Sequence, residues 1–355
     1  MGGHALSTPS VRLDAQAYHH LAKDLTIRLA PCASRLAVIA SYGAKDSFGD
    51  MDILVAADPG YDPLVLARFV QAGNGCDEIV RNGPVTSLGL HLTQGQFQID
   101  LIAIAPECFD FAYRYFCFND LGNLLGRVAH KAGFSLGHKG LEAVLRRGDH
   151  VLGRHLLTRD WRHALNFLSY DGKEYERRAT QNGFQTLEDI FRFAASSPYF
   201  HPDIYALDQV NARARVRDRK RPTYTKFLDW IQGPVRTTLP HFDWTNKVER
   251  RAQLQEKAMA WFPGYGDFLR DAEAHAALRE QAHQRFNGRI VGDLTGLSGP
   301  RLGQLIARIK AGFDSDQAFE AWAAQAPDED IREIVDGAHR ALQDNAASTG
   351  QKVAP

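Results

Sequence analysis

The sequence predicts an α+β protein, in which a small mixed or antiparallel sheet with flanking helices is followed by a largely α-helical carboxy-terminal part. Up to about residue 106, short β-branched apolar runs alternate with segments of helical spacing. From about residue 107, apolar residues follow helical spacing almost throughout. The chain has 355 residues, of which 44% are hydrophobic and 24% charged, an ordinary globular composition with room for about two or three domains.

The first elements are a helix and two strands. Apolar residues over 11–31 have mostly helical spacing and stop at Pro31, which predicts an amphipathic helix. The runs RLAVIAS (35–41) and MDILVAA (51–57) are apolar, rich in β-branched residues and bounded by turn residues. They predict two neighbouring strands.

A helix and a hairpin complete the predicted sheet region. Residues 64–71 have helical spacing. The segments 86–93 and 97–104 predict a β-hairpin across Gln94, Gly95 and Gln96. Beyond residue 107, a short strand pair near 133–145 is the one expected exception to helical structure.

Composition excludes several classes of protein. Lys and Arg (42) balance Asp and Glu (42), so the overall charge gives no argument for a nucleic-acid or membrane partner. The chain opens with no signal-peptide pattern, and no apolar run approaches the ~18 residues of a membrane span. We expect a soluble cytoplasmic protein, and the cysteines, which form no C-x-x-C pair, fit a reducing compartment: Cys32, Cys76, Cys108 and Cys117.

Two aspartates, Asp50 and Asp52, stand at the start of an otherwise apolar strand. Side chains two apart in a strand point to the same face, so these carboxylates lie side by side. A third acid, Asp100, lies within the apolar run FQIDLIAI, which we infer is a neighbouring strand. Like charges this close persist chiefly when a cation lies between them, and oxygen ligands favour Mg²⁺ or Mn²⁺. The trio therefore predicts a site for two such ions, although Asp100 taken alone could be a turn cap or a solvated side chain.

With these acids, the sequence resembles the nucleotidyltransferase superfamily of the DNA polymerase beta type. That family has a Gly-Ser turn, an acid-x-acid strand and a third acid on a later strand. Here ASY (40–42), KDSFGDMD (45–52) and IDL (99–101) stand in these places. Over about 35–200 the chain is similar to family X DNA polymerases in particular, with Tyr115–Phe116, Asn123, Arg127, a GFxLxxxGL hairpin at 133–141 and TLEDIFRF at 186–193.

The resemblance implies a role for each acid. Asp50 and Asp52 would hold both metal ions, and Asp100 would hold the ion that lowers the pKa of a primer 3′ hydroxyl. Three further groups would bind the β and γ phosphates of a nucleotide: the Ser41 hydroxyl, the backbone amide of Gly49 and Lys45.

Four later residues would contact the nucleotide and the template. Tyr115 and Phe116 would pack under the sugar. Asn123 would meet the minor-groove edge of the incoming base, and Arg127 would approach the templating side. Core packing is the alternative for the aromatic pair, and a solvated helix position is the alternative for Arg127.

The sequence departs from the family pattern in three places. Ala40 replaces the turn glycine, which weakens the case for a close backbone approach there. The turn is one residue shorter and lacks an arginine that the polymerases place in it, for which only Lys45 could substitute. FCFN (116–119) replaces the family's F-x-G-S, so sugar discrimination is open.

The segment 286–313 resembles the tail of CCA-adding tRNA nucleotidyltransferases and related poly(A) polymerases. Its pattern of G-x-x-L followed by G-x-x-G-P-x-x-G implies two helices joined by a Gly-Pro turn near RNA. A similar reading is a helix-hairpin-helix in which residues 296–299 offer amides to a phosphate. An ordinary helix pair with Gly299 and Pro300 as turn residues is the alternative.

A basic stretch, 211–226, contains one acid among its arginines and lysines. Alternate arginines could follow a phosphate backbone, while a solvated charged face is the alternative. The residues expected to bind nucleic acid are Arg213, Arg215, Arg217, Arg219, Lys220 and Arg221.

These inferences divide the chain into six segments. They are an amino-terminal helix (1–34), a palm-like nucleotidyltransferase domain (35–106), a nucleotide- and base-binding subdomain (107–200), a helical, basic nucleic-acid-binding region (201–285), a helical tail (286–345) and a disordered end (346–355).

The expected function is metal-dependent addition of nucleotides from NTP or dNTP to a polynucleotide 3′ end, DNA or tRNA, with release of pyrophosphate by a monomer. Asn123 and Arg127 favour template use, and the CCA-enzyme-like tail favours end addition. Nucleotidyl transfer to a small molecule or protein is one alternative, and a non-catalytic nucleic-acid-binding module is another. Unpaired carboxylates on a strand face would destabilise such a module.

Overall fold

The computed structural model describes residues 5–75, 78–148, 150–180, 183–209 and 212–348. The chain forms two compact units, one from residues 1–144 with 154–265 and the other from residues 145–153 with 266–355. The division near residue 265 falls inside the segment 201–285 that the sequence suggests is one region. The last predicted segment, 346–355, lies outside the described residues from 349 onward.

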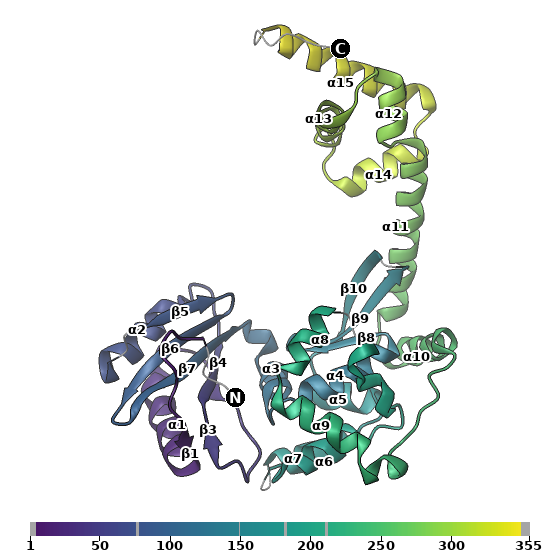
Figure 1. Ribbon diagram of the computed structural model, residues 1–355. Helices are drawn as coiled ribbons and strands as arrows, with labels where there is room; N and C mark the ends of the chain where they lie inside the picture. Colours follow the sequence, from purple (N-terminus) through teal and green to yellow (C-terminus); the bar gives the residue numbers. More distant parts are fainter. Residues whose placement is uncertain (1–4, 76–77, 149, 181–182, 210–211, 349–355) are drawn as a thin grey trace. The chain divides into compact units, whose positions relative to one another are not determined.

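A five-stranded mixed sheet opens the first unit (Figure 1). Strands β4 and β7 pair in parallel at its centre, and every other neighbouring pair is antiparallel. The order is β2 (Leu36–Val38), β4 (Asp50–Ala56), β7 (Gly95–Ile104), β6 (Val85–Leu92) and β5 (Ile79–Asn82).

The hairpin predicted over 86–104 is confirmed, with Leu92 opposite Gly95 in the register. The turn is therefore Thr93–Gln94, one residue earlier than expected. The edge strand β5 is an addition, because its few half-exposed residues give no clear alternation in the sequence.

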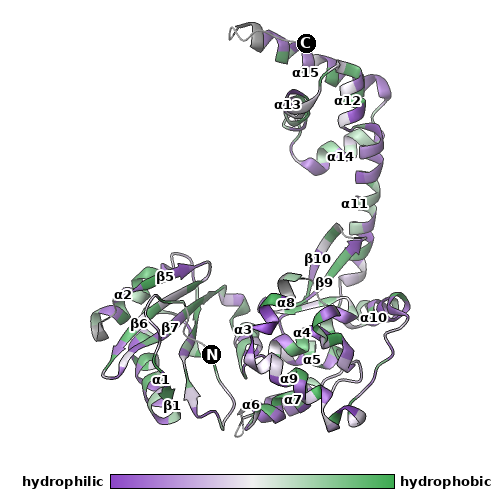
Figure 2. Ribbon diagram, in the orientation of Figure 1, coloured by the Kyte–Doolittle hydropathy of each residue, from purple (hydrophilic) through white to green (hydrophobic). Residues whose placement is uncertain are grey.

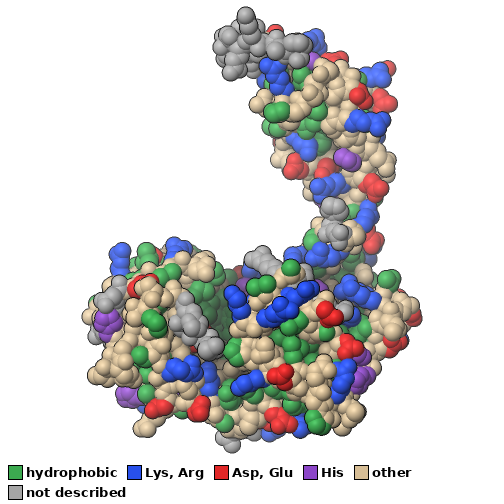
Figure 3. Space-filling view, viewed as in Figure 1, with side chains coloured by type: hydrophobic (Ala, Val, Ile, Leu, Met, Phe, Trp, Pro, Cys, Tyr) green, Lys and Arg blue, Asp and Glu red, His purple; other side chains and the backbone are tan. Residues whose placement is uncertain are grey.

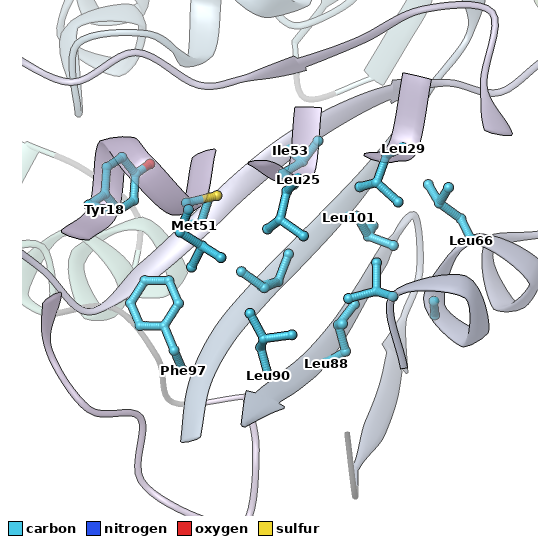
Figure 4. Packing of buried hydrophobic residues seen from close by; sticks show 14 of the residues in the cluster. Tyr18, Leu25, Leu29, Met51, Ile53, Leu66, Leu88, Leu90, Phe97 and Leu101 are labelled. Carbon is cyan, nitrogen blue, oxygen red and sulfur yellow. The ribbon is translucent and has the colours of Figure 1, made fainter. Parts of the chain in front are cut away.

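Two helices cover one face of the sheet. Helix α1 (Ala15–Leu29) begins where the Asp14 carboxylate accepts a hydrogen bond from the Ala17 amide, and α2 (Pro63–Asn74) begins with proline behind an Asp62 cap. Their apolar faces meet the strand residues that point to the same side (Figure 4). The labelled members of this core are Tyr18, Leu25, Leu29, Met51, Ile53, Leu66, Leu88, Leu90, Phe97 and Leu101.

The opposite face of β4 carries Asp50 and Asp52 at its start and apolar residues at its end. Leu54 and Ala56 pack there with Ile104 and with Phe109 and Ala112 of α3 (Phe109–Phe116). Helix α3 therefore covers the apolar half of this face, and a cleft lies over the acidic half. A short ladder of β1 (Leu13–Asp14) and β3 (Ser47–Phe48) ties the amino-terminal segment to the approach of β4.

The rest of the first unit is mainly helical, as predicted, with one small sheet. Strands β8 (Phe134–Gly137), β9 (Gly140–Arg147) and β10 (His150–Thr158) form this sheet, which confirms the strand pair expected near 133–145 and adds a third strand. The helices are α4 (Leu121–Ala132), α5 (Trp161–Phe167), α6 (Gly172–Thr180), α7 (Leu187–Ala194), α8 (Ala212–Arg219), α9 (Pro222–Gln232) and α10 (Lys247–Trp261). Short 3₁₀ segments are Ala30–Cys32, Pro106–Cys108, Pro202–Tyr205, Leu207–Gln209 and Pro234–Thr238.

The second unit is a helical bundle with its own core, which includes Phe286, Val291 and Leu305. Residues 145–153 of the β-hairpin belong to this unit, where Arg147 pairs with Glu280 at 3.0 Å on the long helix that follows residue 265. Helices throughout the chain show hydrophobic and hydrophilic bands along their lengths (Figure 2). The helices are α11 (Tyr265–Arg285), α12 (Gly288–Thr295), α13 (Gly299–Lys310), α14 (Asp316–Gln325) and α15 (Asp328–Ser348).

The segment 286–313 forms two helices joined by a tight turn. Gly296 and Gly299 have φ values of 70° and 58°, in the left-handed region that favours glycine. Pro300 follows in the first turn of α13. These two helices pack inside the core of the second unit, so the geometry agrees with both the RNA-enzyme tail and the ordinary helix pair.

The predicted fold class is confirmed as α+β, with a mixed sheet and a helical carboxy-terminal part. Within the described residues, no helix is both long enough and apolar enough to span a bilayer.

Candidate active site

Asp52 and Asp100 are partners in the register of the parallel strands β4 and β7. The expectation that Asp100 lies on a strand next to Asp52 is therefore confirmed. Asp50 shares their face of the sheet because it is two residues from Asp52, whereas Met51 points into the core and is fully buried. Parallel pairing thus gathers carboxylates from two distant parts of the sequence at one place.

The three acids interact electrostatically. Burial, together with the smaller effects of the Asp50 and Asp100 charges, raises the pKa of Asp52 to about 7, while Lys45 acts in the opposite direction. Burial also raises the pKa of Asp100, although hydrogen bonds from Ser87 and Gln98 oppose this. Near neutral pH, Asp52 therefore carries a proton for part of the time.

Gln98 holds the Asp100 carboxylate in place. Its side-chain amide nitrogen lies 2.9 Å from both Asp100 oxygens, and its amide oxygen accepts a hydrogen bond from the backbone of Ala5. The Ser10 hydroxyl links the two strands, because it donates to the Gly49 carbonyl at 2.7 Å and accepts from the Gln98 backbone at 3.0 Å. The amino-terminal segment thus supports the acids of both strands.

The donor chemistry of this cluster suits a divalent cation. Three carboxylates share one sheet face, and two of them have raised pKa values that a cation would lower. The side chains as placed do not converge on one point, because among the described residues no group of three or more His, Cys, Asp or Glu side chains is arranged to hold a metal ion.

The turn before β4 carries the predicted phosphate-binding groups. Ser41 donates a hydrogen bond to the Asn119 side chain at 2.9 Å, and the Lys45 ammonium lies 4.3 Å from the centre of the Phe48 ring. Burial lowers the pKa of Lys45, and the negative charge of Asp50 opposes this. The turn is tied to a distant segment, because the Gly43 and Ala44 amides donate to the carbonyls of residues 184 and 185, each at 2.8 Å.

The segment FCFN, which departs from the family pattern, forms a strained turn. Phe118 and Asn119 have φ values of 60° and 59°, a conformation that is uncommon without glycine. The turn is held because the Phe118 amide donates to the Ala40 carbonyl at 2.7 Å and its ring packs against Phe184. Packing and this hydrogen bond therefore hold the bulky Phe118 in a conformation that it rarely adopts. The same turn places the Asn119 side chain beside Ser41.

The four residues that the resemblance assigns to the nucleotide and template lie on α3 and α4. Phe116 borders the acid cleft and stacks on His138, with ring centroids 5.9 Å apart, and Tyr115 packs edge-on against Phe116. The Asn123 amide nitrogen is buried without a hydrogen-bond partner among the described residues. Arg127 is itself largely buried and pairs with Asp218, whose side chain is fully buried, so the charge of Arg127 is already compensated inside the protein.

The basic stretch is helical rather than extended. Successive alternate positions of α8 are separated by ~200° around the helix axis, so Arg215, Arg217 and Arg219 do not share one face. The side chain of Arg213 lies outside the described part of the structure. Two of them bond within the protein: Arg215 donates to the Leu207 carbonyl, and Arg217 pairs with Asp218 at 2.9 Å. A continuous track of alternate arginines is therefore absent from this described segment, although Lys and Arg side chains gather over α8 on the face shown in Figure 3.

Two adjoining clefts open beside the acids. One, of about 300 Å³, is bordered by Asp50 and Asp52, and the other, of about 240 Å³, extends from Asp50 toward Arg12. Sequence reasoning missed several residues on their walls. Asn119 lies in a motif that the sequence marks as irregular, whereas the others carry no local signal: Tyr18, Asp120, Pro222 and Thr223.

Comparisons with known proteins find likeness among solved structures only. No family model matches the chain, and no curated protein matches it. Among solved structures, the Leishmania infantum polymerase beta in a ternary P/T complex aligns with 39% of this chain at 14% identity and a TM-score of 0.32. The aligned region spans 62% of that polymerase chain. A likeness at this level gives no argument about function, which has to be inferred from the residues of the site.

Proposed function

We propose that the protein is a metal-dependent nucleotidyltransferase that adds nucleotides from NTP or dNTP to a polynucleotide 3′ end and releases pyrophosphate. The observation that carries the proposal is the pairing of Asp52 with Asp100 on parallel strands, with Asp50 on the same sheet face. The GDMD strand and its order with the later motifs add sequence support.

Asp50, Asp52 and Asp100 would hold Mg²⁺ or Mn²⁺, which when bound would stabilise the charge that develops on the transferred phosphoryl group. The chain's own residues have three further tasks. Asp52 would lose its proton when a cation binds, because its pKa is raised to about 7. Lys45 and the Ser41 hydroxyl, both on the turn beside the acids, bind phosphate oxygens. Tyr18, on α1, is buried and gives the cleft an apolar wall beside Asp50 and Asp52.

A primer-extension gel tests the proposal. Labelled single-stranded, duplex and tRNA substrates are incubated with each nucleotide and with Mg²⁺ or Mn²⁺. We expect extension by the wild type and its loss in Asp52→Asn and Asp100→Asn, while Glu273→Gln, which removes an exposed carboxylate of α11, retains it. Activity that survives both active-site substitutions would refute the assignment.

The same reactions separate the alternatives. Label transferred from an α-labelled nucleotide to a small molecule or to protein, with no extended primer, would indicate the other class of nucleotidyl transfer. Binding of oligonucleotides without any transfer, and without dependence on the three aspartates, would indicate a non-catalytic module.

A further inference from the structure

Three cations from one short segment line the acid clefts. Lys220 and Arg221 border the cleft that contains Asp50 and Asp52. Lys226, in the second turn of α9, borders the adjoining cleft together with Arg12 and Lys45. The junction between α8 and α9 therefore forms a wall common to both clefts, which we call the 220–226 wall.

The 220–226 wall is fixed in position by buried anchors on both sides. On the α8 side, Asp218 is fully buried and pairs with Arg217 and Arg127. On the α9 side, Tyr224 is fully buried and its hydroxyl donates to the Tyr205 carbonyl at 2.9 Å. The backbone that carries the three cations is consequently held before any ligand arrives, which reduces the entropy cost of binding.

The cations retain capacity for an anion. Among the described residues, Arg221 donates only through Nη1, to Asp120 at 2.8 Å, which leaves the other guanidinium N–H groups available. The ammonium groups of Lys220 and Lys226 are exposed and have no partner within the described part of the chain. Arginine and lysine donors in this number are the groups that proteins use to bind phosphate.

Phosphate also resolves an electrostatic difficulty of the clefts. Asp50 and Asp52 repel a polyanionic substrate, and Asp120 adds a further carboxylate to the same cleft. A cationic wall beside them offsets this repulsion and attracts substrate. If the three cations served only as counter-ions for the acids, their removal would change stability and leave phosphate affinity unaltered.

We propose that Lys220, Arg221 and Lys226 form a phosphate-binding wall of the acid clefts and contact phosphate groups of the nucleotidyl-transfer substrate. This inference deepens the proposed function and rests on it for the identity of the substrate. The shared chemistry is a phosphate anion, which can come from the triphosphate of an incoming nucleotide or from the phosphodiester backbone of the acceptor strand.

Binding measurements test the wall without any need for catalysis. Calorimetric titration uses the full chain with two probes, inorganic triphosphate and a single-stranded oligonucleotide that lacks a terminal triphosphate. The variants are Lys220→Ala, Lys226→Ala and their double substitution. Lys23→Ala, which removes an exposed lysine of α1 outside both clefts, is the matched control.

Arg221 needs a paired design because its removal leaves the Asp120 carboxylate without its partner. We therefore compare Arg221→Lys with the double variant Arg221→Gln and Asp120→Asn. Circular dichroism and the thermal midpoint show whether each variant is folded. If the Arg221 variants unfold, the variants of the two exposed lysines, Lys220 and Lys226, still test the proposal.

We expect the lysine double variant to weaken at least one probe about tenfold, the effect of losing charge-assisted hydrogen bonds, and Lys23→Ala to leave both unchanged. Loss for triphosphate assigns the wall to the nucleotide, and loss for the oligonucleotide assigns it to the acceptor strand. The proposal would be overturned if the lysine double variant bound both probes with wild-type affinity. It would also be overturned if the wild type bound neither probe.

These outcomes are distinct from failure of the proposed function. A wild type that binds phosphate through the wall and never extends a primer refutes nucleotidyl transfer alone. A wild type that extends primers, with unchanged KM in the lysine double variant, refutes the wall alone.

Discussion

The side-chain amide of Gln98 lies 2.9 Å from both carboxylate oxygens of Asp100, two residues along the same strand. Gln98 is almost fully buried and is also tied to Ala5, so its amide has little freedom to move. The position of the third acid is thus set by an uncharged neighbour, which orients the carboxylate without neutralising its negative charge, as an arginine or lysine would.

Substitution of Gln98 tests this control. Gln98→Leu should lower kcat for primer extension about tenfold and raise the Mg²⁺ concentration for half-maximal activity, because Asp100 loses its orientation. It should also destabilise the fold by about 1–3 kcal/mol, since the Ala5 amide loses its acceptor. Gln94→Leu, in the exposed hairpin turn, is the control, and equal cation requirements in the two variants would contradict the role.

The raised pKa of Asp52 predicts a pH dependence of stability. Its pKa rises from 3.8 in the unfolded chain to about 7 in the folded one, so between these values the folded state binds more protons. The contribution of Asp52 to stability therefore falls as pH increases from about 4 to about 7 and then stays constant. Asp52→Asn should stabilise the cation-free protein by of order 1 kcal/mol at pH 8 and leave it unchanged at pH 3.

Urea unfolding at several pH values measures this effect. Addition of Mn²⁺ at pH 8 should stabilise the wild type and not the variant, because the cation favours the ionised carboxylate. If Asp52→Asn were less stable than the wild type at pH 8 without a cation, burial of the Asp52 charge could not be the cause of its raised pKa.

The ion pair of Arg127 with Asp218 should be essential for stability. Asp218 has no exposed surface, so Asp218→Ala leaves the positive charge of Arg127 without its partner and should cost about 3–5 kcal/mol. Arg127→Met should cost a similar amount, and the double variant less than the sum of the two. Chemical denaturation measures these values, with the exposed Asp229→Ala of α9 as control, and additive costs would exclude direct coupling.

The left-handed turn at Asn119 allows backbone and side-chain effects to be separated. Asn119→Gly and Asn119→Ala both remove the hydrogen bond from Ser41. Only glycine suits a φ of 59° without strain, so the alanine variant should be about 1 kcal/mol less stable than the glycine variant. Thermal unfolding of the two variants checks this difference, and a more stable alanine variant would show that the turn relaxes to another conformation.

Much of the sheet could be predicted from the sequence because its signals are local. The apolar run behind Asp50 and Asp52 and the run around Asp100 give their strands directly, and one register then places the acids together. The rest of the site depends on contacts that no local pattern encodes. Arg221 reaches the cleft because the chain returns from α8, more than a hundred residues after Asp50, and the helical form of α8 separates arginines that alternate in the sequence.

The strained turn shows another limit of prediction. The pattern FCFN lacks the glycine that a left-handed position favours, so the sequence gives no sign that Phe118 adopts this conformation. Packing against Phe184 and a hydrogen bond to Ala40 stabilise it, and both partners are remote in sequence.

The two backbone hydrogen bonds from Gly43 and Ala44 to residues 184 and 185 have a practical consequence for dissecting the protein. A fragment that ends with the last strand of the five-stranded sheet would keep all three aspartates and lose the tether of the loop bearing Lys45. The shortest piece that retains this anchorage extends through Thr186, and its loop should resist proteases that cleave the shorter piece.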